Sequence, residues 1–305
     1  MTEKARWFGR ARRMTTRKRL AEMLWDTLYV GGWPARLGRP LGFQGPLQLR
    51  RYDVRLPGRR AGAPPLRVGF ISDFHVGPAT HPALAREACA RIAAERPDLL
   101  LLGGDYVSFH ARYARALVEP LAAIEAPLGK FAVLGNHDLI GDERYIMARL
   151  AEAGVRTLVN ENVRLPAPHD DLWLVGLDNT EQGEPDAERA LAGADGARLV
   201  LMHSPDGLAA LGAHDFSAAF CGHVHGGQFW LNGRSLIHFH GPLSVQYLRG
   251  GVFATGNQAD RSLVVSRGVG CGNLPMRRGA DPEVLLCSLH AADGAEPPPL
   301  ASTDR

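Results

Sequence analysis

Short apolar runs alternate with stretches of helical spacing from residue 66 to about residue 160. The apolar runs are bounded by turn residues, which predicts buried strands at 66–72, 98–102, 130–134 and 155–159. Between them, apolar residues recur with a helical period at 81–96, 113–125 and 142–153. Strands that alternate with helices of this length predict βαβ units, and therefore a layered α/β domain.

The second half of the chain is richer in strands than in helices. Apolar runs predict strands at 172–176, 198–202, 218–221, 251–255, 263–266 and 284–289, and partial alternation predicts another at 47–56. The α/β domain is therefore expected to span residues 46–290. The tail at 291–305 contains three consecutive prolines and is predicted to be disordered.

Residues 1–45 differ from the rest of the chain and are interpreted as a basic, amphipathic segment. The part from Arg6 to Val30 is predicted to be a helix, which the residues from Gly31 to Pro34 break. Residues 1–20 contain eight Lys or Arg and one acidic residue, Glu3. Basic residues with aromatic anchors favour a helix at a membrane interface; the alternatives are a helix packed on the domain or a solvated arm. Nucleic acid is not an expected partner, because leucines and aromatic residues lie among these charges.

The composition is that of a globular protein with a sizeable core. The chain has 305 residues, of which 45% are hydrophobic and 22% charged, and a formal net charge of +3. It contains no run of 18 apolar residues, and no long apolar region follows the basic start, so neither a spanning helix nor a cleaved signal is expected. The expected location is the cytoplasm, with peripheral contact to the inner membrane. Four cysteines without a C-x-x-C pair are interpreted as reduced, buried thiols.

Polar residues able to bind metal follow directly after five of the predicted strands. They are Asp73 and His75, Asp105, Asn136 with His137 and Asp138, His203, and His223 with His225. Ligand sites of open α/β sheets lie beyond the carboxyl ends of the strands, so these side chains are expected to meet at one edge. Each short motif alone is weakly specific, but five of them at five strand ends indicate a single metal site.

The donor set suits two divalent cations. Asp and Asn oxygens together with His nitrogens fit manganese, iron or zinc, of which manganese is favoured. Two ions about 3.5–4 Å apart share an oxygen ligand, which a carboxylate such as Asp105 can supply. Glycines such as Gly104, Gly135 and Gly222 let the backbone turn tightly and approach a ligand.

These motifs resemble those of the calcineurin-like metallophosphoesterases. The matching blocks are Asp73-Phe74-His75, Gly104-Asp105, Gly135-Asn136-His137-Asp138, His203 and Gly222-His223-Val224-His225, in the family's order. The strings at 71–75, 221–228 and 266–270 are similar to those of a bacterial, membrane-associated phosphodiesterase subgroup, some of whose members act on lipid-linked phosphates. The resemblance covers residues 66–290 and implies a four-layer α/β/β/α sandwich.

The resemblance also implies a role for each site residue. Asp73, His75 and His225 would bind the first metal, Asn136, His203 and His223 the second, and Asp105 would bridge the two. His137 would face the scissile phosphate as electrostatic stabiliser or general acid, with Asp138 orienting it. A metal-activated hydroxide would attack phosphorus, and no covalent enzyme intermediate is needed.

Residues that contact the substrate are harder to predict from the sequence. Arg267, in Ser-Arg-Gly after a strand, is a candidate phosphate clamp, and Arg277 is a second. The alternative is that both are surface or structural arginines. The apolar segment Trp230–Leu248, which holds His238 and His240, either covers the site or forms a core hairpin with a loop.

The leading hypothesis is a dinuclear metal-dependent phosphodiesterase or pyrophosphatase, acting on a lipid-linked substrate at a membrane surface. One alternative is a soluble nucleotide phosphodiesterase or phosphoprotein phosphatase. A more distant one is a catalytically inactive scaffold of the same fold. Such a scaffold should lack some ligands or the His137-Asp138 pair, and all of them are present.

Overall fold

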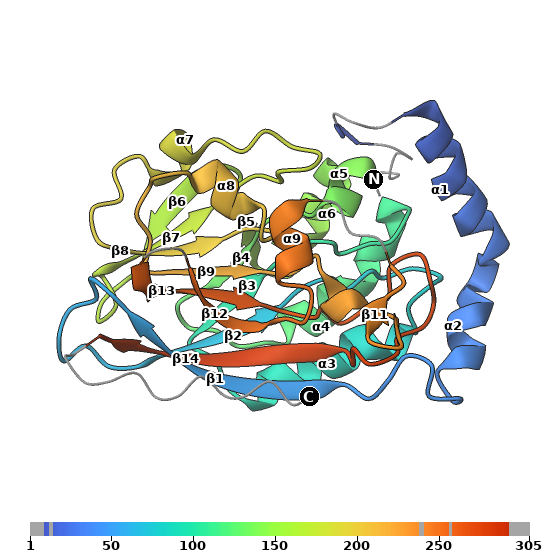
Figure 1. Ribbon diagram of the computed structural model, residues 1–305, viewed down its shortest axis with the longest axis horizontal. Coiled ribbons are helices and arrows are strands. Elements are labelled where there is room, and N and C mark those ends of the chain that lie inside the picture. The colour runs from blue at the N-terminus through green and yellow to red at the C-terminus, as the bar shows by residue number, and fades with distance from the viewer. Residues whose placement is uncertain (1–8, 12–14, 238–240, 256–257, 293–305) are drawn as a thin grey trace.

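The computed structural model describes residues 9–11, 15–237, 241–255 and 258–292, and Figure 1 shows the arrangement of its elements. One six-stranded sheet has the order β1-β14-β2-β3-β4-β5. Its strands are β1 (Gln48–Leu56), β2 (Leu66–Ile71), β3 (Leu99–Leu102), β4 (Lys130–Ala132), β5 (Val155–Thr157) and β14 (Glu283–Ala291). Neighbouring strands run parallel except β14 and β2, which are antiparallel. The carboxyl ends of β2, β3 and β4 therefore meet at one edge.

A second six-stranded sheet has the order β12-β13-β9-β8-β7-β6. Its strands are β6 (Glu161–Arg164), β7 (Leu172–Gly176), β8 (Ala197–Leu201), β9 (Ala218–Cys221), β12 (Gly251–Thr255) and β13 (Gln258–Val265). Its central strands β7, β8, β9 and β13 run parallel, and the edge strands β6 and β12 pair antiparallel with their neighbours. Of these strands, β6 was not predicted, because the run Glu161–Arg164 is mostly polar.

The alternating leucines of β3 show how the sheets are stacked. Leu99 and Leu101 lie in a core shared with Leu199 and Phe220 of the second sheet. Leu100 and Leu102 point the other way, into a core shared with helices. A third core lies between the other face of the second sheet and its own helices. Three cores separate four layers, so the predicted α/β/β/α sandwich is confirmed.

The outer layers are made of short helices. The helices beside the first sheet are α3 (Pro82–Ala94), η2 (Ala111–Leu117), α4 (Val118–Ala122), α5 (Asn136–Ile140) and α6 (Glu143–Glu152). Those beside the second sheet are α7 (Ala187–Leu191), α8 (Gly207–Leu211) and α9 (Pro242–Gln246). The helix expected at 113–125 is divided into the 3-10 turn η2 and the short α4. Pro120 fits at the start of a helix, where no intrahelical partner is required for its missing N–H.

The N-terminal segment packs along one side of the domain, at the right of Figure 1. It forms α1 (Thr16–Leu28), a kinked turn η1 (Val30–Gly32) and α2 (Trp33–Gly38). Gly31 and Gly32 both have positive φ, which explains the predicted helix break. No helix among the described residues is long and apolar enough to cross a membrane.

Residues 9–11 are tied to the domain beside α5. The backbone N–H groups of Gly9 and Ala11 donate to the carbonyls of Ile140 and Leu139 at 2.9 and 3.0 Å. The guanidinium of Arg10 binds both carboxylate oxygens of Asp178 at 3.0 Å. At the other end of the chain, β14 continues to Ala291, and the rest of the predicted disordered tail, 293–305, lies outside the described residues.

Candidate metal centre

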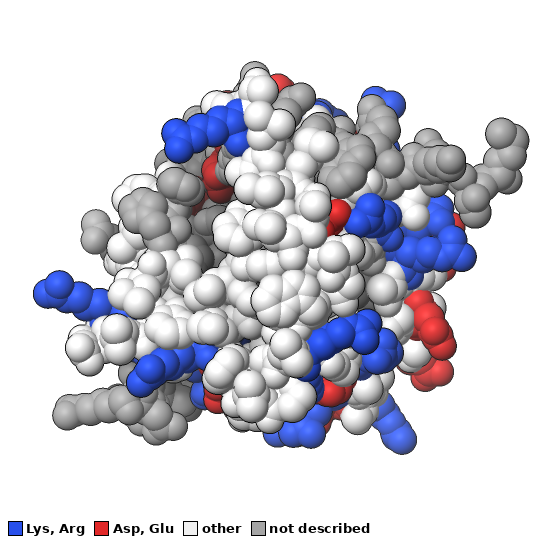
Figure 2. All heavy atoms as spheres, turned by 90° about the vertical axis from the view of Figure 1, so that its right-hand side faces the viewer, with Lys and Arg blue, Asp and Glu red and all other residues white. Residues whose placement is uncertain are grey.

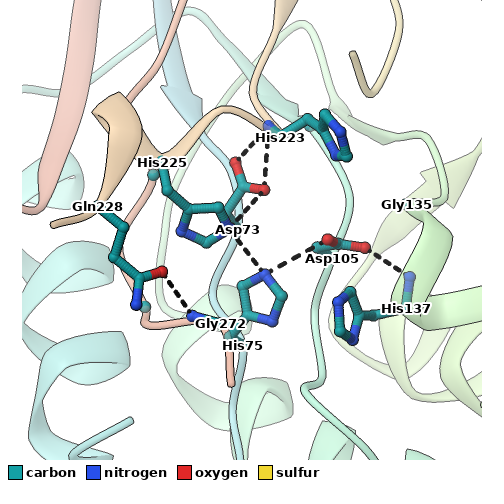
Figure 3. A network of polar contacts seen from close by, with 12 residues as sticks. Asp73, His75, Asp105, Gly135, His137, His223, His225, Gln228 and Gly272 are labelled. Carbon is teal, nitrogen blue, oxygen red and sulfur yellow. Dashed lines mark hydrogen bonds and ion pairs between the residues drawn. The ribbon is translucent and has the colours of Figure 1, made fainter. Parts of the chain in front are cut away.

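Both sheets deliver the expected ligands to the same place. Asp73 and His75 follow β2, Asp105 follows β3, and Asn136 opens α5 after β4. His203 follows β8, and His223 and His225 follow β9, where His225 opens the turn η3 (His225–Gly227). Figure 3 shows Asp73, His75, Asp105, His223 and His225 gathered in one place.

The backbone is strained at most of these ligands. Five non-glycine residues of the site have positive φ: Asp73, His75, Asp105, His223 and His225. For residues with a Cβ this conformation costs roughly 1–2 kcal/mol each, and such strain gathers at functional sites. Glycines relieve crowding nearby, since a Cβ on Gly135 would collide with the Asp105 carboxylate and one on Gly222 with that of Asp73.

The expected first metal triad forms one cluster. The Nε2 atoms of His75 and His225 lie 3.0 Å apart, and Nε2 of His225 lies 3.6 Å from Oδ1 of Asp73. One donor atom from each of these three residues lies within 4.8 Å of the other two. All three side chains are buried, so a cation here would be held by protein groups rather than by bulk water.

The expected second set forms a neighbouring cluster. Nε2 of His203 lies 3.1 Å from Oδ1 of Asn136 and 3.2 Å from Nδ1 of His223. Nδ1 of His203 contacts the Gly103 carbonyl at 2.8 Å, and because a carbonyl only accepts, Nδ1 must donate. The other nitrogen, Nε2, is thereby turned toward Asn136 and His223, as second-sphere hydrogen bonds of metal-binding histidines do.

Asp105 lies between the two clusters. Its Oδ2 is 3.3 Å from Nε2 of His75 and 3.4 Å from Nε2 of His203, so one oxygen faces a histidine of each set. Its Oδ1 accepts the backbone N–H of His137 at 2.9 Å, which fixes the rotation of the carboxylate. This is the position that a bridging ligand requires.

The donor spacing fits metal coordination. Ligands about 2.1 Å from a shared ion lie about 3.0–3.4 Å from one another in octahedral or tetrahedral sites. The facing donor pairs lie between 3.0 and 3.6 Å apart. The residues present therefore fit two divalent cations.

Electrostatics favour positive charge at the same place. Burial raises the pKa of Asp73 to about 6, and burial lowers the pKa of His75 and of His223 to about 4 each. For His203, burial acts in the opposite direction to the Asp105 carboxylate, which prevails and raises its pKa to about 10. Burial also works against ionised Asp105, yet the charge of His203 prevails and holds the pKa of Asp105 well below its usual value. A cation between these groups would supply positive charge, which stabilises the ionised form of Asp105.

His137 lies beside the first cluster and faces it from α5. Its Nδ1 contacts the Ser108 carbonyl at 2.6 Å and therefore donates to it, which fixes the orientation of the ring. Its ring meets that of His75 edge to face, with centroids 4.8 Å apart. One donor atom of His137 also lies within 4.8 Å of donor atoms of His75 and Asp105, so distance alone admits it as a ligand. Its place outside the metal shell remains a prediction.

Asp138 was expected to orient the imidazole of His137, and the structure gives this carboxylate different partners. Its Oδ2 accepts the backbone N–H groups of Asp105 and Gly135, and its Oδ1 that of Tyr106, all at 2.8 Å. Asp138 therefore ties the Asp105 loop to the start of α5. The group that orients the His137 ring is the Ser108 carbonyl.

The two arginines expected to bind substrate are engaged within the protein. Arg277 is buried, and its guanidinium donates to the carbonyls of Gly270, His225, Arg267 and Ala280, with Nη2 3.2 Å from Nδ1 of His225. Nε of Arg267 donates to the Arg249 carbonyl at 2.8 Å and lies 3.7 Å from Glu283. The burial of Arg277 fits a structural role, and its contact with substrate stays a prediction.

Two contributors were missed at the sequence level. Ser108 holds the His137 ring through its carbonyl, and its hydroxyl donates to the His75 carbonyl at 2.9 Å. Tyr106 offers its backbone N–H to Asp138. Both act mainly through main-chain atoms, so neither side chain gave a sequence signal beyond its place just after Asp105.

The fold and the paired donor clusters define a protein built to hold two metal ions. The family model for calcineurin-like phosphoesterases matches residues 66–227. The chain is 30% identical to the phosphodiesterase YaeI of Escherichia coli over 77% of this chain and 86% of that protein. It is 26% identical to an uncharacterized metallophosphoesterase of Aquifex aeolicus, covering 80% of this chain and 92% of that one. It is also 26% identical to the UDP-2,3-diacylglucosamine pyrophosphatase LpxG of Chlamydia trachomatis, covering 79% and 88%. The chain belongs to the calcineurin-like phosphoesterase family, as its motifs predicted.

Proposed function

We propose that this protein hydrolyses a phosphodiester or pyrophosphate bond with the help of two divalent cations, manganese being the favoured metal. The observation that carries the proposal is the position of Asp105 Oδ2, which faces a histidine of each cluster at 3.3 and 3.4 Å. Bound metal ions would lower the pKa of a water and offset charge on the phosphoryl oxygens. The retained donors and the presence of His137 beside them speak against an inactive scaffold.

The residues around the clusters have separable tasks in this proposal. Asp73, His75 and His225 hold one ion, and Asn136, His203 and His223 hold the other, with Asp105 shared. His137 faces the scissile phosphate with Nε2, because Ser108 occupies its Nδ1. In its protonated form Nε2 donates to the phosphoryl or leaving oxygen, as electrostatic stabiliser or general acid.

The substrate we propose is a lipid-linked phosphate ester reached at the inner face of a membrane, with the protein attached peripherally. The relative LpxG bears the name of a UDP-2,3-diacylglucosamine pyrophosphatase, which supports an amphiphilic substrate. The eight Lys or Arg among residues 1–20 support contact with an anionic surface.

A comparison of substrates tests the proposal. Manganese-loaded wild type and His137→Ala are assayed with a chromogenic phosphodiester, a lipid-linked diphosphate, a cyclic nucleotide and a phosphopeptide. The wild type should cleave the first two, and His137→Ala should keep its metal and lose about 10²–10⁴-fold in kcat. Faster cleavage of the nucleotide or phosphopeptide would favour the soluble alternatives. Metal loss in His137→Ala would make this residue a ligand.

A further inference from the structure

The exposed large apolar side chains are concentrated in three segments. Among the described residues, twelve such side chains are more than a third exposed. Nine lie between Leu20 and Phe43, two (Leu231 and Leu236) belong to the hairpin of β10 (Trp230–Leu231) and β11 (Arg234–Ser235), and one is Val245 on α9. We call these twelve side chains the apolar face. So large an exposed apolar set calls for a partner.

The helix α1 buries an acidic side chain and exposes its leucines, which is unusual for a helix that packs only on its own domain. Its acidic residue Asp26 faces inward and is 6% exposed, paired with Arg112 at 2.7 Å and with the Tyr113 hydroxyl at 3.0 Å. Leu20 and Leu24 point outward and are 62% and 57% exposed. An amphipathic helix normally buries its leucines against the core. Among the described side chains of α1, Asp26 is the buried one, and the leucines remain available.

One loop, at residues 277–278, is hydrogen-bonded both to the segment that follows α2 and to the hairpin strand β10. The backbone N–H of Arg277 donates to the Phe43 carbonyl at 2.6 Å. The next residue, Arg278, donates to the Gln228 carbonyl and accepts from the Trp230 N–H, both at 2.9 Å. In Figure 1, α2 and β11 lie on the same side of the molecule. Figure 2 shows uncharged atoms across the centre of that side, with Lys and Arg and fewer Asp and Glu around them.

The charge of these segments indicates the chemistry of the partner. No Asp or Glu occurs in the sequence from Thr27 to Tyr52 or from Gln228 to Gly250. Both stretches carry arginines, including exposed Arg36, Arg234 and Arg249. Apolar side chains with a half-exposed Trp33, bordered by cations, match the boundary between headgroups and acyl chains of an anionic bilayer.

A second copy of the chain fits this surface less well. In a twofold dimer the same surface meets itself, so the basic, acid-free stretches would come close to each other. Like charges at such an interface oppose association.

We propose that the apolar face seats the protein on an anionic lipid surface, with α1, α2 and the hairpin inserted together. The inference rests on the proposed function and names the surface through which that function meets its substrate. The loop that joins the two parts of the face is also the loop of Arg277, whose side chain binds His225 of the first cluster. A seated lipid would thus present its phosphate close to the metal centre.

Flotation of the full chain with vesicles tests the proposal. The vesicles are made of phosphatidylglycerol with phosphatidylcholine, or of phosphatidylcholine alone. Leu24→Glu and Leu236→Glu change one exposed residue in each part of the face. Ala213→Glu changes an exposed residue after α8 that does not belong to the apolar face, and it adds the same charge as a control. Turnover of a soluble chromogenic diester reports that each variant is folded.

Wild type and Ala213→Glu should float with the anionic vesicles, and less so at high salt. Each leucine variant should bind about tenfold more weakly or worse, with unchanged turnover of the soluble diester. Equal flotation of all four proteins would overturn the proposal. So would sedimentation showing a wild-type dimer that Leu24→Glu dissociates. Because flotation requires no catalysis, vesicle binding without any turnover would count against the proposed function alone.

Discussion

Replacing Arg277 tests whether this residue supports the structure or binds the phosphate of the substrate. The side chain is 5% exposed and stands behind His225, on the side away from Asp73. Its donors reach four backbone carbonyls and one ring nitrogen. Arg277→Met keeps much of the apolar volume and removes every one of these donors. Arg278→Met removes the same charge from the exposed neighbouring residue and serves as the matched control.

The expected loss of stability is large. A buried acceptor that loses its donor costs about 1–3 kcal/mol, and relief from burying a guanidinium offsets part of the total. Removing one partner from a buried charged network typically costs about 3–5 kcal/mol, and we expect Arg277→Met to fall in that range. For a chain of this size the melting temperature should drop by roughly 6–20 °C. Arg278→Met should change stability by less than about 0.5 kcal/mol.

The second effect concerns the first metal cluster. Loss of a partner that orients a ligand typically weakens metal affinity about 10–100-fold, so Arg277→Met should need more manganese for half-maximal activity. Urea unfolding and metal titration measure the two effects. The reasoning would be refuted if Arg277→Met matched Arg278→Met in stability and metal affinity but raised KM for a phosphodiester, since that outcome describes a substrate clamp.

Three further predictions concern the metal site and the docked helix. Asp105→Ala should lose both ions and all turnover, and elemental analysis that finds two ions per chain would contradict the bridging position. Removal of metal by a chelator should lower the melting temperature, because burial of Asp73 beside Asp105 is then uncompensated, and added manganese should restore it. Asp26→Ala should destabilise the docking of α1 by about 1–3 kcal/mol, seen as faster proteolysis near residue 28. Wild-type cleavage rates would show that other contacts hold the helix.

Much of the fold could be predicted because its strands are short and uniformly apolar. Leu99–Leu102 is buried on both faces, so its composition alone indicates a central strand. These apolar runs also allowed the metal ligands to be predicted, since a polar residue such as Asp105 is conspicuous just after such a run. Positions at the edges were harder to predict. The strand Glu161–Arg164 alternates weakly, and its existence depends on pairing with β7 rather than on its own residues.

The motif that contains Asp138 predicted its place near the metal ligands but not its hydrogen-bond partners. Its presence after His137 suggested a pair of side chains acting together, but successive helical side chains point in different directions. From the first turn of α5, the carboxylate turns back to three N–H groups in the loops at 105–106 and 135. Burial and the nearby charge of Asp105 raise its pKa to about 7, while these N–H groups oppose the rise. Its position beside the metal ligands was thus predictable, whereas its partner was not.

The burial of two charged side chains, Arg277 and Asp26, could not be predicted from the sequence. Arg277 and Asp26 are charged, and sequence reasoning assigns charged side chains to solvent or substrate, because burial without partners is too costly. Some of the partners that make burial possible come from distant segments: His225 for Arg277, and Arg112 of η2 for Asp26. Backbone carbonyls in particular exist at every residue and leave no sequence signal. A buried charge therefore becomes visible only once the fold is known. Of the two, Arg277 holds the loop that carries His225 of the first cluster, and Asp26 holds α1 against η2.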